Sequence, residues 1–428
     1  STPKPSSAAS DVYKRQMLRA YKYRIYPTDE QKVLFAKTFG CCRFVYNWAL
    51  NLKIEAYRQE KRSVAYKEVQ DRLVNELKKE NQWLAEVNSQ ALLNSIRNLD
   101  IAYKNFFRDT HAVEFPRFKS RKNRQSFQCP QHCSIDFAKG TITIPKAKDI
   151  PAVLHRGFKG TVKTVTVSMT PSGRYFASIL VDTAIQEQKT SEPVHDTAIG
   201  IDLGIKSLAV CSDGRTFGNP KNLSGSLDRL KVLQKRLSRK RKGSSNRNKA
   251  RIRVARLQEH IANCRRDNLH KITHALTHDS QVRTICMEDL NVKGMQYNHH
   301  LAQAIGDASF GMFLTLLEYK CRWYGVNLIK IDRFAPSSKT CCKCGYVYKG
   351  LKLSERSWTC PECGTRHDRD FNAACNIKEF GLKALPSERG DVKPVDCPTV
   401  DDRPHVLKSR GRKKQEKRRD NSLRSLCL

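Results

Sequence analysis

Residues 341–374 read CCKCGYVYKGLKLSERSWTCPECGTRHDRDFNAA. This segment contains two Cys-x-x-Cys pairs, Cys341 with Cys344 and Cys360 with Cys363, and fifteen residues separate the pairs. Each pair can present two thiolates to one tetrahedral ion at about 2.3 Å, and the spacing is typical of a zinc ribbon. Four thiolates leave no open coordination position, so we expect one structural Zn²⁺ that holds a small knuckle with few apolar residues of its own.

An acidic residue follows this knuckle, and two others end apolar strands far away in the chain. Asp370 opens a segment whose apolar spacing predicts a helix that ends at Gly381, a residue type that suits a helix C-terminus. Asp202 ends one predicted strand, and Glu288 ends another that spans residues 282–288. Taken singly, each acid could be a helix cap or a solvated charge.

Together the three acids predict metal-dependent chemistry on nucleic acid. Carboxylates at two strand ends and one helix start can converge to hold two Mg²⁺ or Mn²⁺ ions about 3.5 to 4 Å apart. Such a pair of ions activates a water and stabilises the leaving oxygen of a phosphodiester.

The charge of the chain points to a polyanionic partner. Its 428 residues include 79 Lys and Arg against 42 Asp and Glu, which gives a formal net charge of +37. This is far more than solubility requires, and nucleic acid is the first candidate partner. Apolar runs fall well short of the roughly 20 residues of a membrane helix, and residues 1–16 have no apolar stretch of signal-peptide type. We therefore expect neither secretion nor membrane insertion, and the 16 cysteines favour a reducing compartment.

The first half of the chain predicts a helical region followed by a small β domain. Residues 18–26 alternate aromatic or aliphatic side chains with cations, as in a strand with a basic face. Thr28 and Gln31 form a capping-box pattern that begins a long helix. Further helices are predicted at residues 66–78 and 89–108, and strands at 141–144, 161–168 and 175–181.

Two basic stretches are candidate phosphate contacts. Aromatic and cationic residues interleave between residues 115 and 127, where they could stack on bases, or form a loop with solvated charges. Between Arg229 and Arg266 stand fifteen Lys and Arg and one acidic residue, while leucines keep helical spacing around a break at residues 243–246. A solvated hairpin is the alternative there, but such one-sided charge repels itself without phosphate. The candidate nucleic-acid contacts are Arg117, Lys119, Arg121, Lys122, Arg124, Lys235, Arg236, Arg239, Lys240, Arg241, Arg247 and Arg251.

Three motifs resemble the TnpB family of transposon-encoded proteins. They are the strand at residues 199–204 (IGIDLG), the segment 287–291 (MEDLN), and the run 337–374 that contains the four cysteines and Asp370. The resemblance extends from Tyr21 to Gly381, and ordered acidic motifs with a zinc ribbon just before the third acid are hard to meet by chance.

The resemblance implies a multidomain α/β fold and an activity. The expected fold is a RuvC-like (RNase H fold) nuclease domain with an inserted zinc ribbon, preceded by a β-barrel wedge domain that an α-helical recognition lobe interrupts. The family's first catalytic aspartate falls on Asp202, its glutamate on Glu288 and its last aspartate on Asp370. The family motifs favour Glu288 over the adjacent Asp289, and Asp370 over Asp368, which is then expected to cap the helix. The implied boundaries are a disordered extension at 1–16, the wedge at 17–27 and 113–185, the helical lobe at 28–112, the nuclease domain at 196–335 and 364–383, the zinc ribbon at 336–363 and a disordered basic tail at 384–428.

The implied partners are a transposon-derived guide RNA and double-stranded DNA, which would be cut next to a short flanking motif. The zinc ribbon is expected to position a DNA strand near the metal ions, and the protein is expected in a prokaryotic cytoplasm in association with the nucleoid. A nuclease-inactive, RNA-guided DNA-binding regulator is one alternative, although the presence of Asp202, Glu288 and Asp370 argues against it. A guide-independent nuclease or a transposase is another, because an RNase H fold alone does not separate cutting from joining.

Overall fold

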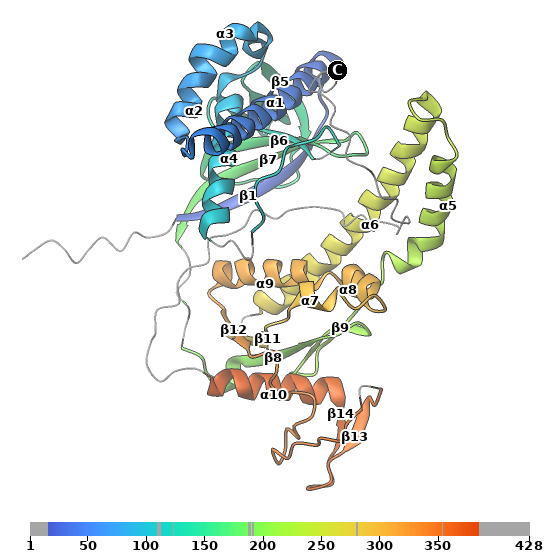
Figure 1. Ribbon diagram of the computed structural model, residues 1–428. Coiled ribbons are helices and arrows are strands. Elements are labelled where there is room, and N and C mark those ends of the chain that lie inside the picture. Colours follow the sequence, from blue (N-terminus) through green and yellow to red (C-terminus); the bar gives the residue numbers. More distant parts are fainter. Residues whose placement is uncertain are drawn as a thin grey trace, which may run out of the picture. The chain divides into compact units, whose positions relative to one another are not determined.

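The computed structural model describes residues 16–108, 113–122, 124–186, 190, 192–279, 281–352 and 354–384, and Figure 1 labels its elements. Of the two segments predicted to be disordered, residues 1–16 and 384–428, the described ranges include only residues 16 and 384, so this prediction lies almost wholly outside them. Gln16 belongs to the first strand. None of the helices described there combines the length and the apolar composition needed to cross a membrane.

The amino-terminal sheet contains seven strands in the order β2-β6-β7-β1-β5-β4-β3, all antiparallel. The strand predicted at residues 18–26 is confirmed as β1, in which Tyr23 and Ile25 are buried and Lys22 is exposed. β1 pairs with β7 along its length and with β5 only through its last two residues. The strands are β1 (Gln16–Ile25), β2 (Gln125–Cys129), β3 (Ser134–Asp136), β4 (Thr141–Ile144), β5 (Ala147–Val153), β6 (Thr161–Met169) and β7 (Tyr175–Gln186).

The strand pairing gives an open sheet, whereas the family resemblance implies a barrel. Among the described residues, β2 and β3 stand at the two ends of the sheet and do not pair with each other. Helices cover the β2 end: Phe127 of β2 packs against Phe35 and Phe39, with ring centroids 5.7 and 5.4 Å apart, and Gln128 accepts a hydrogen bond from Asn98. Because helices protect this end, the sheet does not need to close on itself.

The capping box predicted at Thr28 is present and begins the long helix α1. Thr28 Oγ1 accepts the backbone N–H of Gln31 (3.3 Å), and the Gln31 side chain accepts the backbone N–H of Thr28 (3.0 Å). The buried face of α1 forms one core with α4 and the sheet. The helical elements here are α1 (Asp29–Glu60), α2 (Tyr66–Arg72), a π-helical turn (Leu73–Leu77), α3 (Lys78–Glu80), a 3-10 turn (Gln82–Glu86) and α4 (Ser89–Arg108).

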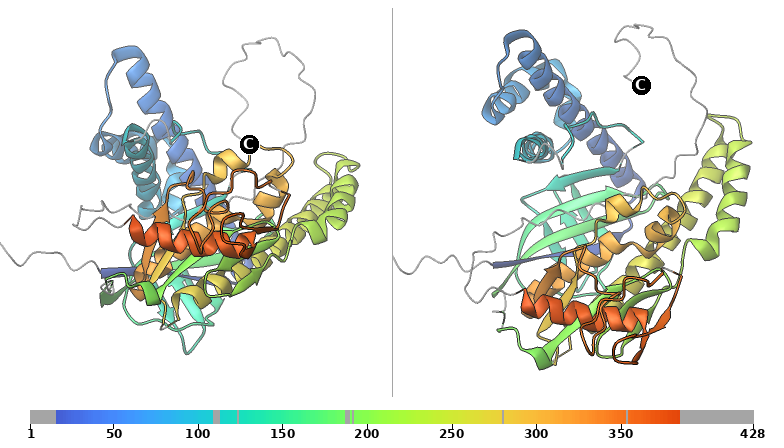
Figure 2. Two further views of the ribbon diagram at one scale, coloured as in Figure 1. Left: turned by 90° about the horizontal axis from the view of Figure 1, so that it is seen from below. Right: turned by 60° about the horizontal axis from the view of Figure 1, so that its bottom comes forward.

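A second, mixed sheet has the strand order β10-β9-β8-β11-β12. β8 runs antiparallel to β9 but parallel to β11, which is parallel to β12. Helix α10 covers one face of this sheet, and helices α6 (Ser245–Thr277) and α9 pack on the other face (Figures 1 and 2). The elements are β8 (Ala198–Leu203), β9 (Ser207–Cys211), β10 (Thr216–Gly218), β11 (Thr284–Glu288), α7 (Val292–Met295), α8 (Ala302–Ala308), α9 (Phe310–Tyr324), β12 (Asn327–Ile331) and α10 (Arg369–Lys383).

Helix α10 begins where the sequence predicts and ends later. Asp368 is its N-cap, as predicted, and its Oδ1 accepts the backbone N–H groups of Asp370 (3.1 Å) and Phe371 (2.9 Å). The predicted end at Gly381 is wrong, because the helix continues two residues further. A Cβ at Gly381 would lie 2.5 Å from Cys286 Sγ, so glycine is explained by close packing on β11 and not by a helix end.

The predicted basic hairpin and the zinc knuckle complete the described fold. Helices α5 (Leu227–Ser238) and α6 (Ser245–Thr277) pack through a small apolar core in which Leu230, Val254 and Leu257 are buried. The helical spacing predicted from these apolar residues is therefore confirmed. The zinc knuckle, residues 337–368, contains the two-stranded hairpin of β13 (Ser357–Thr359) and β14 (Arg366–Asp368) and lies directly before α10.

Candidate active site

The three predicted acids lie at one edge of the second sheet. Strands β8 and β11 are parallel, with Ile201 paired to Met287, so that Asp202 and Glu288 follow at neighbouring strand ends. Asp370 stands in the first turn of α10, which lies over the same strands. Sequence separation is large, but the parallel pairing and the packing of α10 bring the three acids close enough to interact electrostatically.

The electrostatics of Asp202 show how close the negative charges are. Burial, followed by the charges of the Glu288 and Asp370 carboxylates, raises the pKa of the Asp202 carboxyl to about 7, although Arg369 and Arg356 oppose the shift. A carboxyl in this position is stabilised as an anion only if positive charge is supplied nearby.

Glu288 is held by a serine from the start of the knuckle. Ser337 donates its hydroxyl to Glu288 Oε1 at 2.7 Å. Burial raises the pKa of Glu288, and the hydrogen bond from Ser337 opposes this shift. The serine thus favours the anionic carboxylate in a site that otherwise disfavours it.

Asp370 is paired with two arginines. Arg369 donates from Nε (3.1 Å) and from one terminal nitrogen (3.0 Å) to Asp370 Oδ1, and Arg356 in the knuckle reaches Asp370 Oδ2 at 3.5 Å. These guanidinium groups balance part of the negative charge of the acid cluster.

The acid cluster has the chemistry that Mg²⁺ or Mn²⁺ prefers. It offers carboxylate oxygens whose negative charges interact, and two of the carboxyls, Asp202 and Glu288, have a raised pKa. In the described part of the chain, only the cysteine cluster has its ligand atoms all within 4.8 Å of one another. The carboxylates are therefore near one another without converging on a single point, and Asp370 is engaged by arginines instead.

The four predicted cysteines converge. Cys341 Sγ and Cys363 Sγ are 3.7 Å apart, and Cys344 Sγ and Cys360 Sγ are 3.6 Å apart. Four sulfurs bonded at 2.3 Å to a tetrahedral zinc would be about 3.8 Å apart, so the cluster fits that ion. Nε2 of the buried His367 lies 3.1 Å from Cys341 Sγ, next to the metal position.

The basic hairpin presents six of its seven candidate cations to solvent. Arg247 instead donates to the backbone carbonyls of Leu237 (3.0 Å) and Lys240 (2.7 Å), which closes the turn between α5 and α6. Arg251 donates to Asn248 Oδ1. The exposed set is Lys235, Arg236, Arg239, Lys240, Arg241 and Arg251.

Two cations of the second basic stretch, Arg117 and Lys119, have partners within the protein, although both are exposed. Arg117 pairs with Glu114 at 2.6 Å. The ammonium of Lys119 lies 3.8 Å from the centroid of the Tyr46 ring, and burial lowers its pKa. Arg121, Lys122 and Arg124 are exposed.

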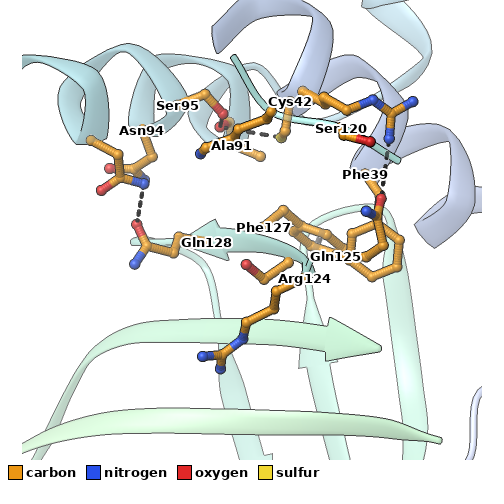
Figure 3. A pocket seen from close by; sticks show the side chains of 14 residues that line it. Phe39, Cys42, Ala91, Asn94, Ser95, Ser120, Arg124, Gln125, Phe127 and Gln128 are labelled. Atoms are coloured by element: carbon orange, nitrogen blue, oxygen red, sulfur yellow. Dashed lines mark hydrogen bonds between the residues drawn. The ribbon is translucent and has the colours of Figure 1, made fainter. Parts of the chain in front are cut away.

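A polar pocket lies between α1, α4 and β2 (Figure 3). It is a cavity of about 90 Å³, and Lys119 and Arg124 are among its lining residues. Its amides are already paired in part: Asn98 donates to Gln128 Oε1 at 3.2 Å, and Arg43 donates to Gln125 Oε1 at 3.1 Å. Amide and guanidinium groups suit a hydrogen-bonding ligand better than an apolar one.

Sequence reasoning missed several residues that contact the acids. Ser337 lies inside a motif that carries the family resemblance, but its bond to Glu288 depends on long-range packing. Arg356 lies between the two cysteine pairs, where one exposed arginine gives no local signal. Asn372 and Asn376 lie after Asp370 on the same helix, and both are almost fully buried. Their burial could not be predicted, because asparagine is usually exposed.

Three family models match parts of the chain. A model described as "Probable transposase" (OrfB_IS605) matches residues 178–299, and one described as "Cas12f1-like, TNB domain" matches residues 310–377. A model described as "Helix-turn-helix domain" (HTH_OrfB_IS605) matches residues 17–62. In this chain that last segment folds as strand β1 followed by the single continuous helix α1.

Two bacterial relatives match over most of their length. A Streptomyces pristinaespiralis protein, provisionally named as an RNA-guided DNA endonuclease, is 42% identical over 376 residues, which cover 86% of this chain and 91% of the relative. InsQ of Escherichia coli (strain K12), with the same provisional name, is 34% identical over 386 residues, which cover 86% of this chain and 93% of the relative.

A known structure has the same overall fold. The cryo-EM structure of the Cas12f1-sgRNA-target DNA complex matches with a TM-score of 0.52 and 14% sequence identity, covering 85% of this chain and 99% of that chain. At this identity the likeness concerns the fold alone.

Proposed function

Because this chain belongs to the TnpB family, we propose that it is an RNA-guided DNA endonuclease that cuts double-stranded DNA next to a short flanking motif. The observation that carries the proposal is the meeting of Asp202, Glu288 and Asp370 at one edge of the sheet, in a chain of net charge +37. The full set of acids favours a nuclease over an inactive DNA-binding regulator.

The second sheet supports a RuvC-like nuclease domain. In an RNase H fold, an antiparallel hairpin is followed by parallel strands, with acids at strand ends on a helix-covered sheet. The order β10-β9-β8-β11-β12 and the cover by α10 have this form. The amino-terminal sheet would be the wedge, and α1 to α4 the recognition lobe that helps to read the flanking motif.

Asp202, Glu288 and Asp370 would hold two Mg²⁺ or Mn²⁺ ions. Two such ions, when bound, activate a water and stabilise the leaving oxygen of the scissile phosphodiester. Ser337 keeps the Glu288 carboxylate anionic and oriented, because its hydroxyl donates to Oε1. Arg369 and Arg356 supply positive charge beside Asp370.

The four cysteines would bind one structural Zn²⁺, and the knuckle would place a DNA strand beside the acids. The exposed cations of the α5–α6 hairpin are the first candidates for guide-RNA phosphate contacts. Association with the nucleoid would follow from guided DNA binding.

The experiment that tests this function is a cleavage assay on the complex as cells make it. The chain is co-expressed with its neighbouring transposon-end sequence and purified, and the bound RNA is sequenced. The complex is then given Mg²⁺ and DNA that matches the RNA guide beside randomised flanks. We expect cleavage next to one flanking motif, lost in Asp202→Ala.

Two other outcomes would replace the proposal with its alternatives. Bound RNA with specific DNA binding but no cutting by the unsubstituted protein would establish a guided regulator. Metal-dependent cutting or joining that persists without RNA would establish a guide-independent nuclease or a transposase.

A further inference from the structure

Two buried amides connect helix α10 to the segment that enters the zinc knuckle. Asn372 and Asn376 are one helical turn apart, and only 0% and 3% of their surfaces are exposed. Their side chains do not bond to their own helix but to the backbone of residues 337–342. Buried amides are costly unless their donors and acceptors are paired, so these bonds fix the helix and the segment against each other.

The bonds surround the first zinc ligand. Asn372 accepts the backbone N–H of Cys342 at 3.0 Å and donates to the carbonyl of Thr340 at 2.7 Å. One side chain is therefore hydrogen-bonded to the residue before Cys341 and to the residue after it. Asn376 donates to the same Thr340 carbonyl at 2.6 Å. The position of Cys341 is therefore tied to the position of α10.

The same segment reaches two of the three acids. Asn376 donates to the Ser337 carbonyl at 2.7 Å, while the Ser337 hydroxyl donates to Glu288 Oε1 at 2.7 Å. Asp370 stands two residues before Asn372 in the first turns of α10. A change in the knuckle is thus passed to Glu288 through one hydrogen bond and to Asp370 through a rigid helix.

The helix has little freedom to absorb such a change. On its sheet side it lies so close to β8 that a Cβ at Gly200 would overlap the carbonyl oxygen of Ala374. With the sheet on one side and residues 337–342 bonded to its buried amides, α10 transmits a displacement of the knuckle rather than deforming locally.

We propose that Ser337, Asn372 and Asn376 are positioning residues that make the zinc knuckle part of the active-site scaffold. Folding of the knuckle around its ion fixes Glu288 and Asp370 for metal binding, in addition to any contact that the knuckle makes with DNA. This inference rests on the proposed function, and it assigns a role to residues that touch neither substrate nor reacting atoms.

The first test removes one hydroxyl. Ser337→Ala should keep its zinc and its affinity for guide-matched DNA within about twofold, whereas the single-turnover cleavage rate and the affinity of the acid site for Mn²⁺ should fall by about 10- to 100-fold, as for other residues that orient metal ligands. Ser337→Thr, which keeps the hydroxyl, should restore both. Thr277→Val is the matched control. The Thr277 hydroxyl is also buried, at the end of α6, and it bonds only to the Thr273 carbonyl of its own helix.

Mn²⁺ affinity is measured by electron paramagnetic resonance on the RNA-loaded full chain, with Asp202→Ala as the blank for ions bound elsewhere. This readout does not require cleavage, so failure of the inference is distinguishable from failure of the proposed function. If the unsubstituted protein does not cut DNA, the proposed function fails, and the Mn²⁺ comparison still decides the role of Ser337.

The second test asks whether zinc and the amides act through one path. Zinc loss through Cys360→Ser and loss of the amides through Asn372→Ala with Asn376→Ala should each weaken Mn²⁺ binding, and combining them should weaken it no further. Full addition of the two effects would overturn the proposal. So would a Ser337→Ala protein with unchanged Mn²⁺ affinity, or one whose slow cleavage is fully explained by lost zinc or weakened DNA binding.

Discussion

Substitution of Gly200 by alanine should displace α10 and disable the candidate active site. Gly200 lies in β8 two residues before Asp202, on the strand face that α10 covers. A Cβ there would overlap the Ala374 carbonyl oxygen and lie 2.6 Å from Lys378 N. Both atoms belong to the backbone of α10, so no side chain can rotate away to make room.

The size of the effect follows from these contacts. Carbon needs about 3.5 Å from a neighbouring heavy atom, so the helix must move away from β8 by about 1 to 1.5 Å. Overpacking of this kind costs about 1 to 3 kcal/mol of stability. A displacement of about 1 Å at Asp370 should lower the cleavage rate by about 100-fold.

Thermal unfolding and single-turnover cleavage of guide-matched DNA measure the two effects. Gly311→Ala in α9 is the control, because a Cβ at Gly311 meets nothing within 4 Å and alanine favours a helix. It should leave the Tm and the cleavage rate unchanged or slightly raise the Tm. A Gly200→Ala protein with the Tm and the cleavage rate of the unsubstituted chain would show that the packing of α10 on β8 has room for a Cβ, and would refute the prediction.

Three other variants test separate parts of the structure. Burial lowers the pKa of Lys320 to about 8, and its Nζ donates to the His270 carbonyl at 2.7 Å. Between pH 8 and 10.5 the unfolded chain therefore binds more protons than the folded chain, so folding becomes more favourable as the pH rises. Measured by urea unfolding, the stability of the unsubstituted chain relative to Lys320→Met should rise by up to roughly 3 kcal/mol over this range. Equal stability differences at pH 7 and pH 10 would contradict this. Cys360→Ser should lose bound zinc in metal analysis and lower the Tm, and retention of one zinc per chain would argue against the four-cysteine site. Arg236→Gln together with Arg239→Gln should flatten the dependence of log RNA affinity on log salt by about 1.4, and an unchanged slope would remove both from the RNA contacts.

Local patterns in the sequence predicted much of the fold. The capping box at Thr28, the N-cap at Asp368 and the helical spacing of the α5–α6 hairpin depend on residues within a few positions of each other, and all three are confirmed. The position of Asp202 at a strand end also follows from alternation within a few residues. The convergence of the four cysteines needed only the spacing of two pairs.

Features that depend on distant packing were not predictable in the same way. Whether the amino-terminal sheet closes into a barrel depends on what covers its end strands, and Phe127 finds helix α1 there. Gly381 looks like a helix end from sequence, but the neighbouring Cys286 requires a glycine inside the helix. Arg247 stays a predicted phosphate contact on its charge, and the bonds from one of its terminal nitrogens to the Leu237 and Lys240 carbonyls could not be read from sequence.

The candidate active site shows the same division. The acids stand at strand ends and a helix start, which the sequence indicates, so their meeting could be anticipated. The groups around them could not, because the partner of Glu288 is Ser337, 49 residues away, and the partners of Asp370 depend on how the knuckle folds.

The most direct test of the account is whether the three acids act as one unit. Asp202→Ala, Glu288→Ala and Asp370→Ala are compared singly and in pairs by single-turnover cleavage of guide-matched DNA, after RNA and DNA binding are shown to be intact. Groups that hold the same metal ions should show strongly non-additive losses, so each single variant should fall to the background rate and no double variant should be worse. A single variant that keeps substantial cleavage, or losses that add from one substitution to the next, would contradict the assignment of these three carboxylates to one site.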